Sequence, residues 1–193
     1  MPLAIRLHQH GGPEVLVEER VSLPSPAAGE ALVAHEAIGV NFIDTYHRSG
    51  LYPLPLPATL GVEAAGTVTA VGKGVTVVKP GDRVGYVVAK PCAYAQEALV
   101  PAERLIPLPD GISSEVAAAS LLKGMTVEFL IRRAFAVQPG QTVLWHAAAG
   151  GVGLLACQWL AHLGARVIGT VSTEQKAQIA RAHGCKETIL YNQ

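Results

Sequence analysis

Hydrophobic and polar positions in the N-terminal half of the chain follow the pattern of short strands separated by tight turns. Runs rich in Val, Ile, Ala and Thr alternate with turns that contain Gly and Pro. Pro53, Pro55 and Pro57 exclude a central strand from their segment, so a loop is expected there. Several short strands at this spacing predict a small, partly open barrel. The predicted strands cover residues 14–19, 31–40, 66–72, 83–88 and 97–100.

Beyond Gly111 the pattern changes to the alternation of helices and strands that is typical of α/β proteins. Residues 113–134 are predicted to be helical, with Ser113 or Ser114 as the N-cap. Gly124 is expected to interrupt this segment and to divide it into two helices. The remaining pattern predicts strands at 142–146, 166–171 and 187–191, and helices at about 151–163 and 173–183.

The composition is that of a globular protein with a sizeable core. Of the 193 residues, 50% are hydrophobic and 16% are charged, and the formal net charge is zero. Such a chain buries enough apolar surface to fold. Because positive and negative charges balance, no general attraction to nucleic acid or to an anionic membrane is expected.

Cysteine usage and the N-terminal sequence predict a soluble cytoplasmic protein. The three cysteines are far apart in the sequence and form no CxxC pair or Cys/His cluster, so no structural zinc site is expected. Their odd number favours a reducing compartment. Residues 1–12 are too short and too polar for a signal peptide, and no apolar run is long enough to span a membrane.

A bend of small residues follows the predicted strand at 142–146. The spacing Gly151-x-Gly153-x-x-Ala156 fits the dinucleotide-binding fingerprint, with Ala at its last position. Small residues at these positions allow a tight turn, the approach of a pyrophosphate to the backbone, and close packing of helix on strand. A glycine cluster that only serves packing is the alternative. The strand before the bend and the helix after it favour a nucleotide site.

The end of the second predicted strand indicates which nucleotide is bound. NAD-binding units usually carry an acidic residue there, about 20 residues after the first glycine, to bind the ribose. Ser172 and Thr173 stand at this place, and Lys176 follows one helical turn later. Hydroxyls beside a cation suit a 2′-phosphate, so NADP(H) is predicted. Two alternatives remain, namely Glu174 as the ribose-binding acid and Lys176 as an ordinary surface lysine.

The whole chain resembles the quinone oxidoreductases (zeta-crystallin type) of the medium-chain dehydrogenase/reductase superfamily. The resemblance lies, in the family's order, in residues 11–16, 39–53, 61–72, 80–84, 117–130 and 147–158. It implies an α/β protein, with a β-rich GroES-like catalytic domain over residues 1–123 and the first half of a Rossmann NADP-binding domain over 124–193. Family members continue beyond this point, so the chain is expected to be truncated at Gln193 relative to them. The resemblance also implies a homodimer for a full-length relative.

The resemblance further implies a site without zinc. Zinc-dependent relatives carry Cys and His in the segments that match 39–44 and 61–66, and this chain has Asn41 and Val62 at those places, although Glu63 remains. Polarisation of a carbonyl must then come from hydrogen-bond donors or from the substrate itself.

The resemblance assigns cofactor-binding roles to ten residues. Asn41 and Tyr46 would lie beside the nicotinamide and are the predicted catalytic residues. From the residues alone, Asn41 offers both a donor and an acceptor, whereas Tyr46 is better interpreted as a half-buried aromatic. Thr126 would contact the cofactor, the pyrophosphate would lie on Gly150, Gly151 and Val152, and the 2′-phosphate and adenosine would lie among Ser172, Thr173, Lys176 and Tyr191.

The predicted function is the NADPH-dependent reduction of quinones or related activated enones, which are good hydride acceptors without a metal. The alternative is a non-catalytic nucleotide-binding or interaction module left by truncation, and zeta-crystallin relatives also have structural and RNA-binding roles. The neutral net charge argues against RNA. A small-molecule quinone or enone is therefore the expected partner.

Overall fold

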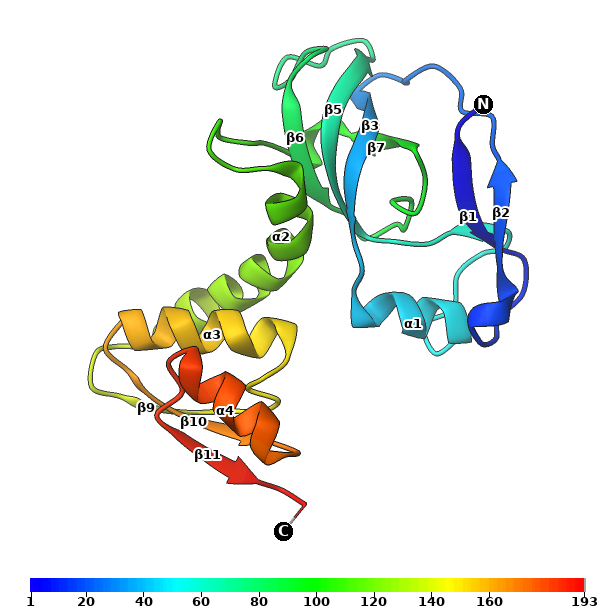
Figure 1. The fold of residues 1–193 in the computed structure, drawn as a ribbon. Coiled ribbons are helices and arrows are strands. Elements are labelled where there is room, and N and C mark those ends of the chain that lie inside the picture. The colour runs from blue at the N-terminus through cyan, green and yellow to red at the C-terminus, as the bar shows by residue number, and fades with distance from the viewer. Residues whose placement is uncertain (193) are drawn as a thin grey trace. The chain divides into compact units, whose positions relative to one another are not determined.

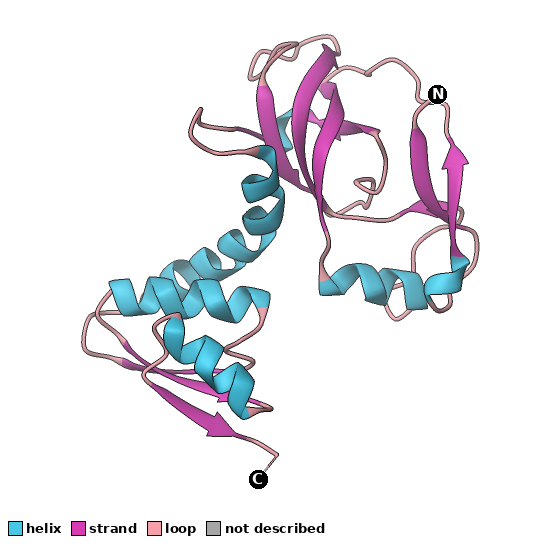
Figure 2. Cartoon of the chain, viewed as in Figure 1, coloured by secondary structure: helices cyan, strands magenta, loops and turns pink. Residues whose placement is uncertain are grey.

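The computed structural model describes residues 1–192. Gln193, the last residue of the predicted Rossmann half, lies outside the described residues. The chain divides into two compact units, residues 1–122 and 123–193. Figure 1 labels the elements of both units, and Figure 2 distinguishes their helices from their strands.

The first unit is built on two antiparallel sheets. Its strands are β1 Leu3–Leu7, β2 Leu16–Arg20, β3 Glu30–Gly39, β4 Ala58–Thr59, β5 Glu63–Val71, β6 Arg83–Val87, β7 Glu97–Pro101 and β8 Leu105–Pro107. The larger sheet has the order β7-β3-β5-β6-β8 and the smaller one has the order β2-β1-β4. Short helices connect the strands, namely η1 Pro13–Val15, α1 Phe42–Ser49 and η2 Ala102–Arg104.

Close contact between β3 and β5 holds the larger sheet together. A Cβ placed on Gly66 would lie 1.9 Å from the Ala34 carbonyl oxygen, so only glycine allows the two backbones to approach this closely. Apolar side chains from several strands of this sheet form a buried core beside it, including Val33, Val68, Val84, Tyr86 and Val100.

All five strands predicted for this unit are confirmed, with small shifts. The strand expected at 14–19 begins only at Leu16, because Pro13 opens a turn of 3-10 helix. The sequence pattern missed β1, β4 and β8. The last two contain only two and three residues, which is too short for alternation to be recognised. The proline segment is a loop, as predicted, and leads into β4.

Helix α1 was not predicted from the sequence. Ile43, Thr45 and Tyr46 have low helix propensity, which hides the helix from a propensity argument. The signals that mark it lie at its ends. The Asn41 backbone N–H donates to Asp44 Oδ2 at 2.9 Å, and Gly50 ends the helix with φ 85°, in the left-handed region that favours glycine.

Helix α2 runs without a break over Ser114–Glu128, so the predicted interruption at Gly124 is wrong. A glycine inside a helix costs only about 1 kcal/mol relative to alanine, and the helix formers on both sides of Gly124 outweigh that cost. The change comes later, where the helix widens into the π-helical turn η3, Phe129–Ala134. The first N-cap candidate is confirmed, because Ser113 Oγ accepts from the Val116 N–H at 3.3 Å.

His35 is a half-buried residue of the first unit that forms hydrogen bonds through both ring nitrogens. Its Nδ1 lies 2.6 Å from the Ala95 carbonyl oxygen, which can only accept, so Nδ1 carries the proton. Its Nε2 therefore accepts from the Tyr86 hydroxyl at 2.8 Å. Burial lowers the pKa of His35 below its ordinary value, and the neutral imidazole is the form that fits these contacts.

We expect the free energy of unfolding to fall as the pH drops below about 6.5, the ordinary pKa of histidine. Because the folded pKa of His35 is lowered, the unfolded chain binds a proton at a higher pH than the folded chain does. The loss therefore accumulates between about 6.5 and the lower folded pKa, and then stops. Denaturant unfolding at a series of pH values should show a steeper slope for the wild type than for His35→Gln. Identical slopes would contradict this assignment.

The second unit is the start of a parallel α/β fold. Its elements are β9 Thr142–Trp145, α3 Gly151–His162, β10 Arg166–Val171, α4 Glu174–Ala182 and β11 Glu187–Leu190. The strands are parallel in the order β11-β10-β9, and α3 and α4 cover the same face of the sheet (Figure 1). All five predicted elements are confirmed within one residue at each end. None of the helices within residues 1–192 combines the length and the apolarity that a membrane crossing requires.

Candidate functional site

The turn between β9 and α3 is the centre of the predicted nucleotide site. Ala147 has φ 52°, a conformation that non-glycine residues rarely adopt. The Gly150 N–H donates to the Ala147 carbonyl oxygen at 2.8 Å, which closes the turn, and α3 begins at Gly151. The first N–H groups of a helix have no acceptor within the helix, so this end suits an anion.

Gly153 is required by the packing of the protein itself. It is buried, and a Cβ at this position would lie 2.4 Å from the Ala147 carbonyl oxygen. Close packing of α3 on the turn therefore requires glycine at this position, and the role of Gly153 in the approach of a pyrophosphate stays a prediction. Gly151 is exposed, and a Cβ there would contact only the flexible Lys123 side chain, at 3.0 Å.

Strand β10 fixes the turn from the side. The Ala148 N–H donates to the Thr170 carbonyl oxygen at 3.1 Å, and the His146 Nδ1 lies 3.1 Å from Thr170 Oγ1. Thr170 is buried, whereas His146 is exposed. The strained turn thus has a rigid support on the neighbouring strand.

Three of the predicted residues meet at the carboxyl end of β10. Thr173 is the N-cap of α4, and its Oγ1 accepts from the Lys176 N–H at 3.3 Å. The Lys176 ammonium donates to Ser172 Oγ at 3.1 Å. A cation and two hydroxyls therefore lie together where the sequence predicted a 2′-phosphate site, and the pair of Ser172 and Lys176 is exposed enough for a ligand to reach.

Glu174, the alternative ribose-binding acid, is paired elsewhere. Its carboxylate forms an ion pair with the guanidinium of Arg181 along α4. Both side chains are exposed, so this pair contributes little to stability, but it turns the carboxylate along the helix. This contact favours Ser172 and Lys176 as the groups that meet a nucleotide.

Tyr191 follows β11 and lies beside the same strand end. Its N–H donates to the Val171 carbonyl oxygen at 3.2 Å, and 59% of the side chain is exposed. Asn192, which the sequence argument missed, donates from Nδ2 to the Ser172 carbonyl oxygen at 3.2 Å. The parallel register of Val171 with Leu190 places Asn192 here, and that register is not visible in a local pattern.

In the first unit, Asn41 is a buried N-cap residue. Its Nδ2 donates to Glu63 Oε2 at 2.7 Å. Asp44 completes the surroundings, because its Oδ2 accepts from the Asn41 N–H at 2.9 Å and from the Tyr94 hydroxyl at 2.8 Å. The Asn41 side chain is therefore held in one orientation by its own unit.

Tyr46 is a half-buried aromatic in a row of rings on α1 and the loop after it. The Tyr46 ring meets Phe42 edge-on at 5.3 Å between centroids, and it meets Tyr52 at the same separation. Phe42 and Tyr52 are 74% and 50% exposed. The row offers an apolar, aromatic surface of the kind on which planar rings pack. Thr126, the remaining predicted residue, is half-buried in the part of α2 that belongs to the second unit.

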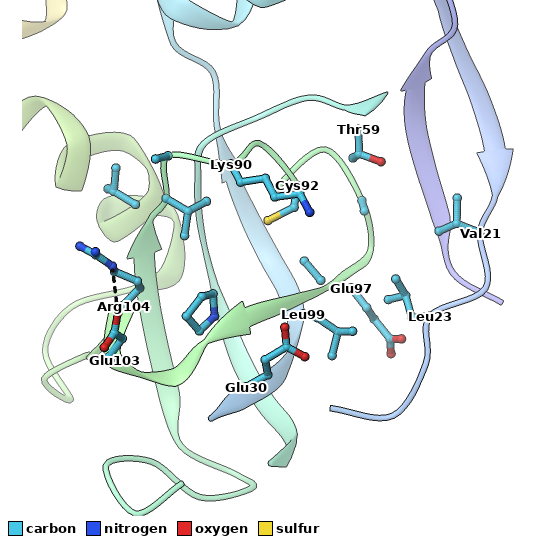
Figure 3. Close-up of a pocket in the computed structure, with 16 residues that line it drawn as sticks. Val21, Leu23, Glu30, Thr59, Lys90, Cys92, Glu97, Leu99, Glu103 and Arg104 are labelled. Atoms are coloured by element: carbon cyan, nitrogen blue, oxygen red, sulfur yellow. Dashed lines mark ion pairs between the residues drawn. The ribbon is translucent and has the colours of Figure 1, made fainter. Parts of the chain in front are cut away.

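A further cavity contains none of these residues. It has a volume of 570 Å³ in the first unit and is lined by Lys90, Cys92, Glu97 and Arg104 among others (Figure 3). Burial raises the pKa of the Cys92 thiol, which keeps it protonated and a poor nucleophile. The cavity contains none of the predicted cofactor residues, and its side chains indicate no catalytic chemistry.

Two family models match the chain. Residues 27–110 match the GroES-like domain of alcohol dehydrogenase, and residues 151–193 match the zinc-binding dehydrogenase family. The chain is therefore similar to dehydrogenases of the medium-chain dehydrogenase/reductase superfamily. The predicted fold class, a GroES-like domain followed by the start of a nucleotide-binding domain, is thereby confirmed.

The resemblance to the quinone oxidoreductases is also confirmed. The chain is 51% identical over 193 residues to a quinone oxidoreductase of Pseudomonas aeruginosa and 47% identical over 199 residues to a 2-haloacrylate reductase of a Burkholderia species. A solved structure of Escherichia coli quinone oxidoreductase complexed with NADPH matches 99% of the chain with a TM-score of 0.97 and 51% identity. The chain spans 59% of the length of both quinone oxidoreductases and 60% of the reductase.

The name of the second family model implies zinc, and the side chains do not fit it. Val62 is buried and apolar at the place where zinc-dependent relatives carry His, and the Asn41 amide is bound to Glu63. Among residues 1–192, no three His, Cys, Asp or Glu side chains are grouped so that they could hold a metal ion.

Proposed function

We propose that this chain binds NADPH and serves in the reduction of quinones or related activated enones. The observation that carries the proposal is the contact between the Lys176 ammonium and Ser172 Oγ at the end of β10, beside the glycine turn. A relative at 51% identity is described as complexed with NADPH, and its name gives a quinone as substrate. The reductase that is 47% identical supports activated double bonds as acceptors.

The residues present fit the cofactor. In the proposal, Gly150, Gly151 and Val152 hold the pyrophosphate at the start of α3, and Thr126 contacts the cofactor from α2. Ser172, Thr173 and Lys176 bind the 2′-phosphate, and Tyr191 packs on the adenosine. These assignments divide the chain into a catalytic domain, residues 1–123, and a nucleotide-binding domain, residues 124–193.

Bound NADPH supplies a hydride, and quinones and enones accept it without a Lewis acid. The protein then has to orient the acceptor and exclude water, which the aromatic row around Tyr46 is suited to do. Asn41 and Tyr46 are the proposed catalytic residues, placed beside the nicotinamide and the acceptor. We also propose a cytoplasmic location, which the three free thiols support, and a homodimer for the full-length relatives.

NADPH oxidation in the presence of a simple benzoquinone tests the proposal, when it is measured beside NADPH binding by fluorescence. Binding together with quinone-dependent oxidation is the expected result. Binding without turnover would favour the non-catalytic nucleotide-binding module. Absence of both would refute the nucleotide site as well.

Ser172→Asp should shift cofactor preference toward NADH. A carboxylate at this position repels the 2′-phosphate and offers an acceptor to the ribose hydroxyls of NADH. We expect NADPH affinity to fall by about tenfold or more, the effect of losing one charge-assisted contact, while NADH affinity stays the same or rises. Ser172→Ala is the matched control, because it removes the hydroxyl without adding charge. Equal losses for both cofactors in Ser172→Asp would contradict the assignment.

A further inference from the structure

Thr170 is a buried residue of β10 that lies just past the end of the neighbouring strand. Strands β9 and β10 run side by side, and Trp145, the last residue of β9, pairs with Gly169 (Figure 1). Beyond Trp145 the chain leaves the sheet and forms the turn that precedes α3, while β10 continues to Val171. The register of the two strands therefore places Thr170 beside the first residues of that turn.

Both the backbone and the side chain of Thr170 contact the turn. Its carbonyl oxygen accepts from the Ala148 N–H at 3.1 Å, and its Oγ1 accepts from the Ala147 N–H at 3.4 Å. The His146 Nδ1 lies 3.1 Å from the same hydroxyl oxygen. A hydroxyl has one donor and two acceptor sites, so a single oxygen serves both of these neighbours. Three consecutive residues of the turn are thus bonded to one residue of β10.

The middle one of these three residues has the strained backbone. Ala147 has φ 52°, a region in which the Cβ of an L-residue crowds the following carbonyl oxygen. Such a conformation persists only where the surrounding structure over-determines it. The Ala147 carbonyl oxygen accepts from the Gly150 backbone N–H at 2.8 Å, whereas the Ala147 N–H donates to a side chain. The conformation of the turn therefore depends on which side chain stands at position 170.

We propose that Thr170 is a positioning residue for the pyrophosphate of the dinucleotide. Its hydroxyl holds Ala147 in the left-handed region. The turn then presents the start of α3, whose first N–H groups have no acceptor within the helix, in the orientation that binds the anion. The inference rests on the proposed function, in which Gly150, Gly151 and Val152 hold the pyrophosphate. It adds a residue that lies outside the glycine fingerprint and acts through the turn.

Thr170→Val should weaken the binding of NADPH and NADH alike, by about two- to tenfold, the effect of losing one neutral hydrogen bond. Valine keeps the branched shape that suits a strand and removes the hydroxyl. Both dinucleotides carry the pyrophosphate, so the ratio of their affinities should stay the same. Adenosine 2′-monophosphate has the 2′-phosphate but no pyrophosphate, so its affinity should not change. The measurement is a titration with each of the three ligands, beside an unfolding curve that shows the variant to be folded.

Two further variants separate positioning from a general structural role. Thr170→Ser keeps the hydroxyl and should bind both dinucleotides with nearly wild-type affinity. Ala147→Gly relieves the strain, because glycine adopts a positive φ without a steric penalty. In that background the turn depends less on the hydroxyl, so Thr170→Val should weaken NADPH by a smaller factor than it does in the wild type.

Thr142→Val is the matched control. Thr142 lies at the opposite end of β9, and its hydroxyl forms no hydrogen bond within residues 1–192. This variant should bind both dinucleotides as the wild type does.

Wild-type affinity for NADPH in a folded Thr170→Val variant would overturn the inference and leave the proposed function intact. The same holds if Thr170→Ser fails to restore binding, or if Thr170→Val has the same effect with alanine and with glycine at position 147. A loss shared by adenosine 2′-monophosphate would also overturn it, because the effect would then lie at the 2′-phosphate. A wild type that binds neither dinucleotide would refute the proposed function, and the inference with it.

Discussion

Gly153→Val is expected to lower the affinity for NADPH by more than about a hundredfold, or about 2.8 kcal/mol. The first carbon of the new side chain would lie 2.4 Å from the Ala147 carbonyl oxygen and 2.7 Å from the Ala148 carbonyl carbon. Backbone atoms cannot move aside as a flexible side chain can, so the turn that precedes α3 must deform. Overpacking of this kind also costs about 1–3 kcal/mol of stability. The measurement is an NADPH titration beside an unfolding curve.

Gly111→Val is the matched control, because a Cβ on Gly111 meets no atom within 4 Å. It should bind NADPH as the wild type does. A folded Gly153→Val variant with normal NADPH affinity would show that the glycine turn has no part in the nucleotide site.

Lys176→Ala should weaken NADPH binding by about ten- to a hundredfold, which corresponds to the roughly 1.5–3 kcal/mol of a hydrogen bond to a charged group. The 2′-phosphate carries nearly two negative charges. The Lys176 ammonium lies 3.1 Å from the Ser172 hydroxyl, so the two groups would contact the phosphate together. NADH lacks this phosphate, so its affinity should change little. Titrations with both cofactors need the same ionic strength, since salt screens the contact.

Lys186→Ala removes the same charge from another exposed position of the second unit and serves as the control. It should leave both affinities near the wild-type values. If Lys176→Ala weakened NADPH and NADH equally, the lysine would not distinguish the phosphate, and the NADP assignment would be wrong.

The second unit was predictable because its local patterns agree with its tertiary structure. Each strand is a short apolar run bounded by glycine or a polar turn, and each helix begins at a small or capping residue such as Gly151 or Thr173. In the first unit, α1 contains residues of low helix propensity, and β4 and β8 are too short to show alternation, so their local patterns did not reveal them. At Gly124 the error is the reverse. The glycine predicted a break in the helix, but the helix-forming residues on both sides keep α2 continuous.

The candidate site also has a part that the sequence predicted and a part that it did not. The meeting of Ser172, Thr173 and Lys176 follows from the βα spacing alone, so the sequence predicted it. The contact of Asn41 with Glu63 needs the register of β3 with β5, which the sequence pattern does not contain. The steric requirement for glycine at position 153 was likewise not predictable, because it arises from a turn in which Ala147 has a φ that is unusual for alanine.

The central claim is that the end of β10 recognises a 2′-phosphate. Competitive titration of the wild-type chain with NADPH and NADH, at one ionic strength, tests it most directly. The account predicts that NADPH binds at least about ten times more tightly, the least that one charge-assisted contact should contribute. Equal affinities, or tighter binding of NADH, would contradict it and would make Glu174 the residue that meets the ribose.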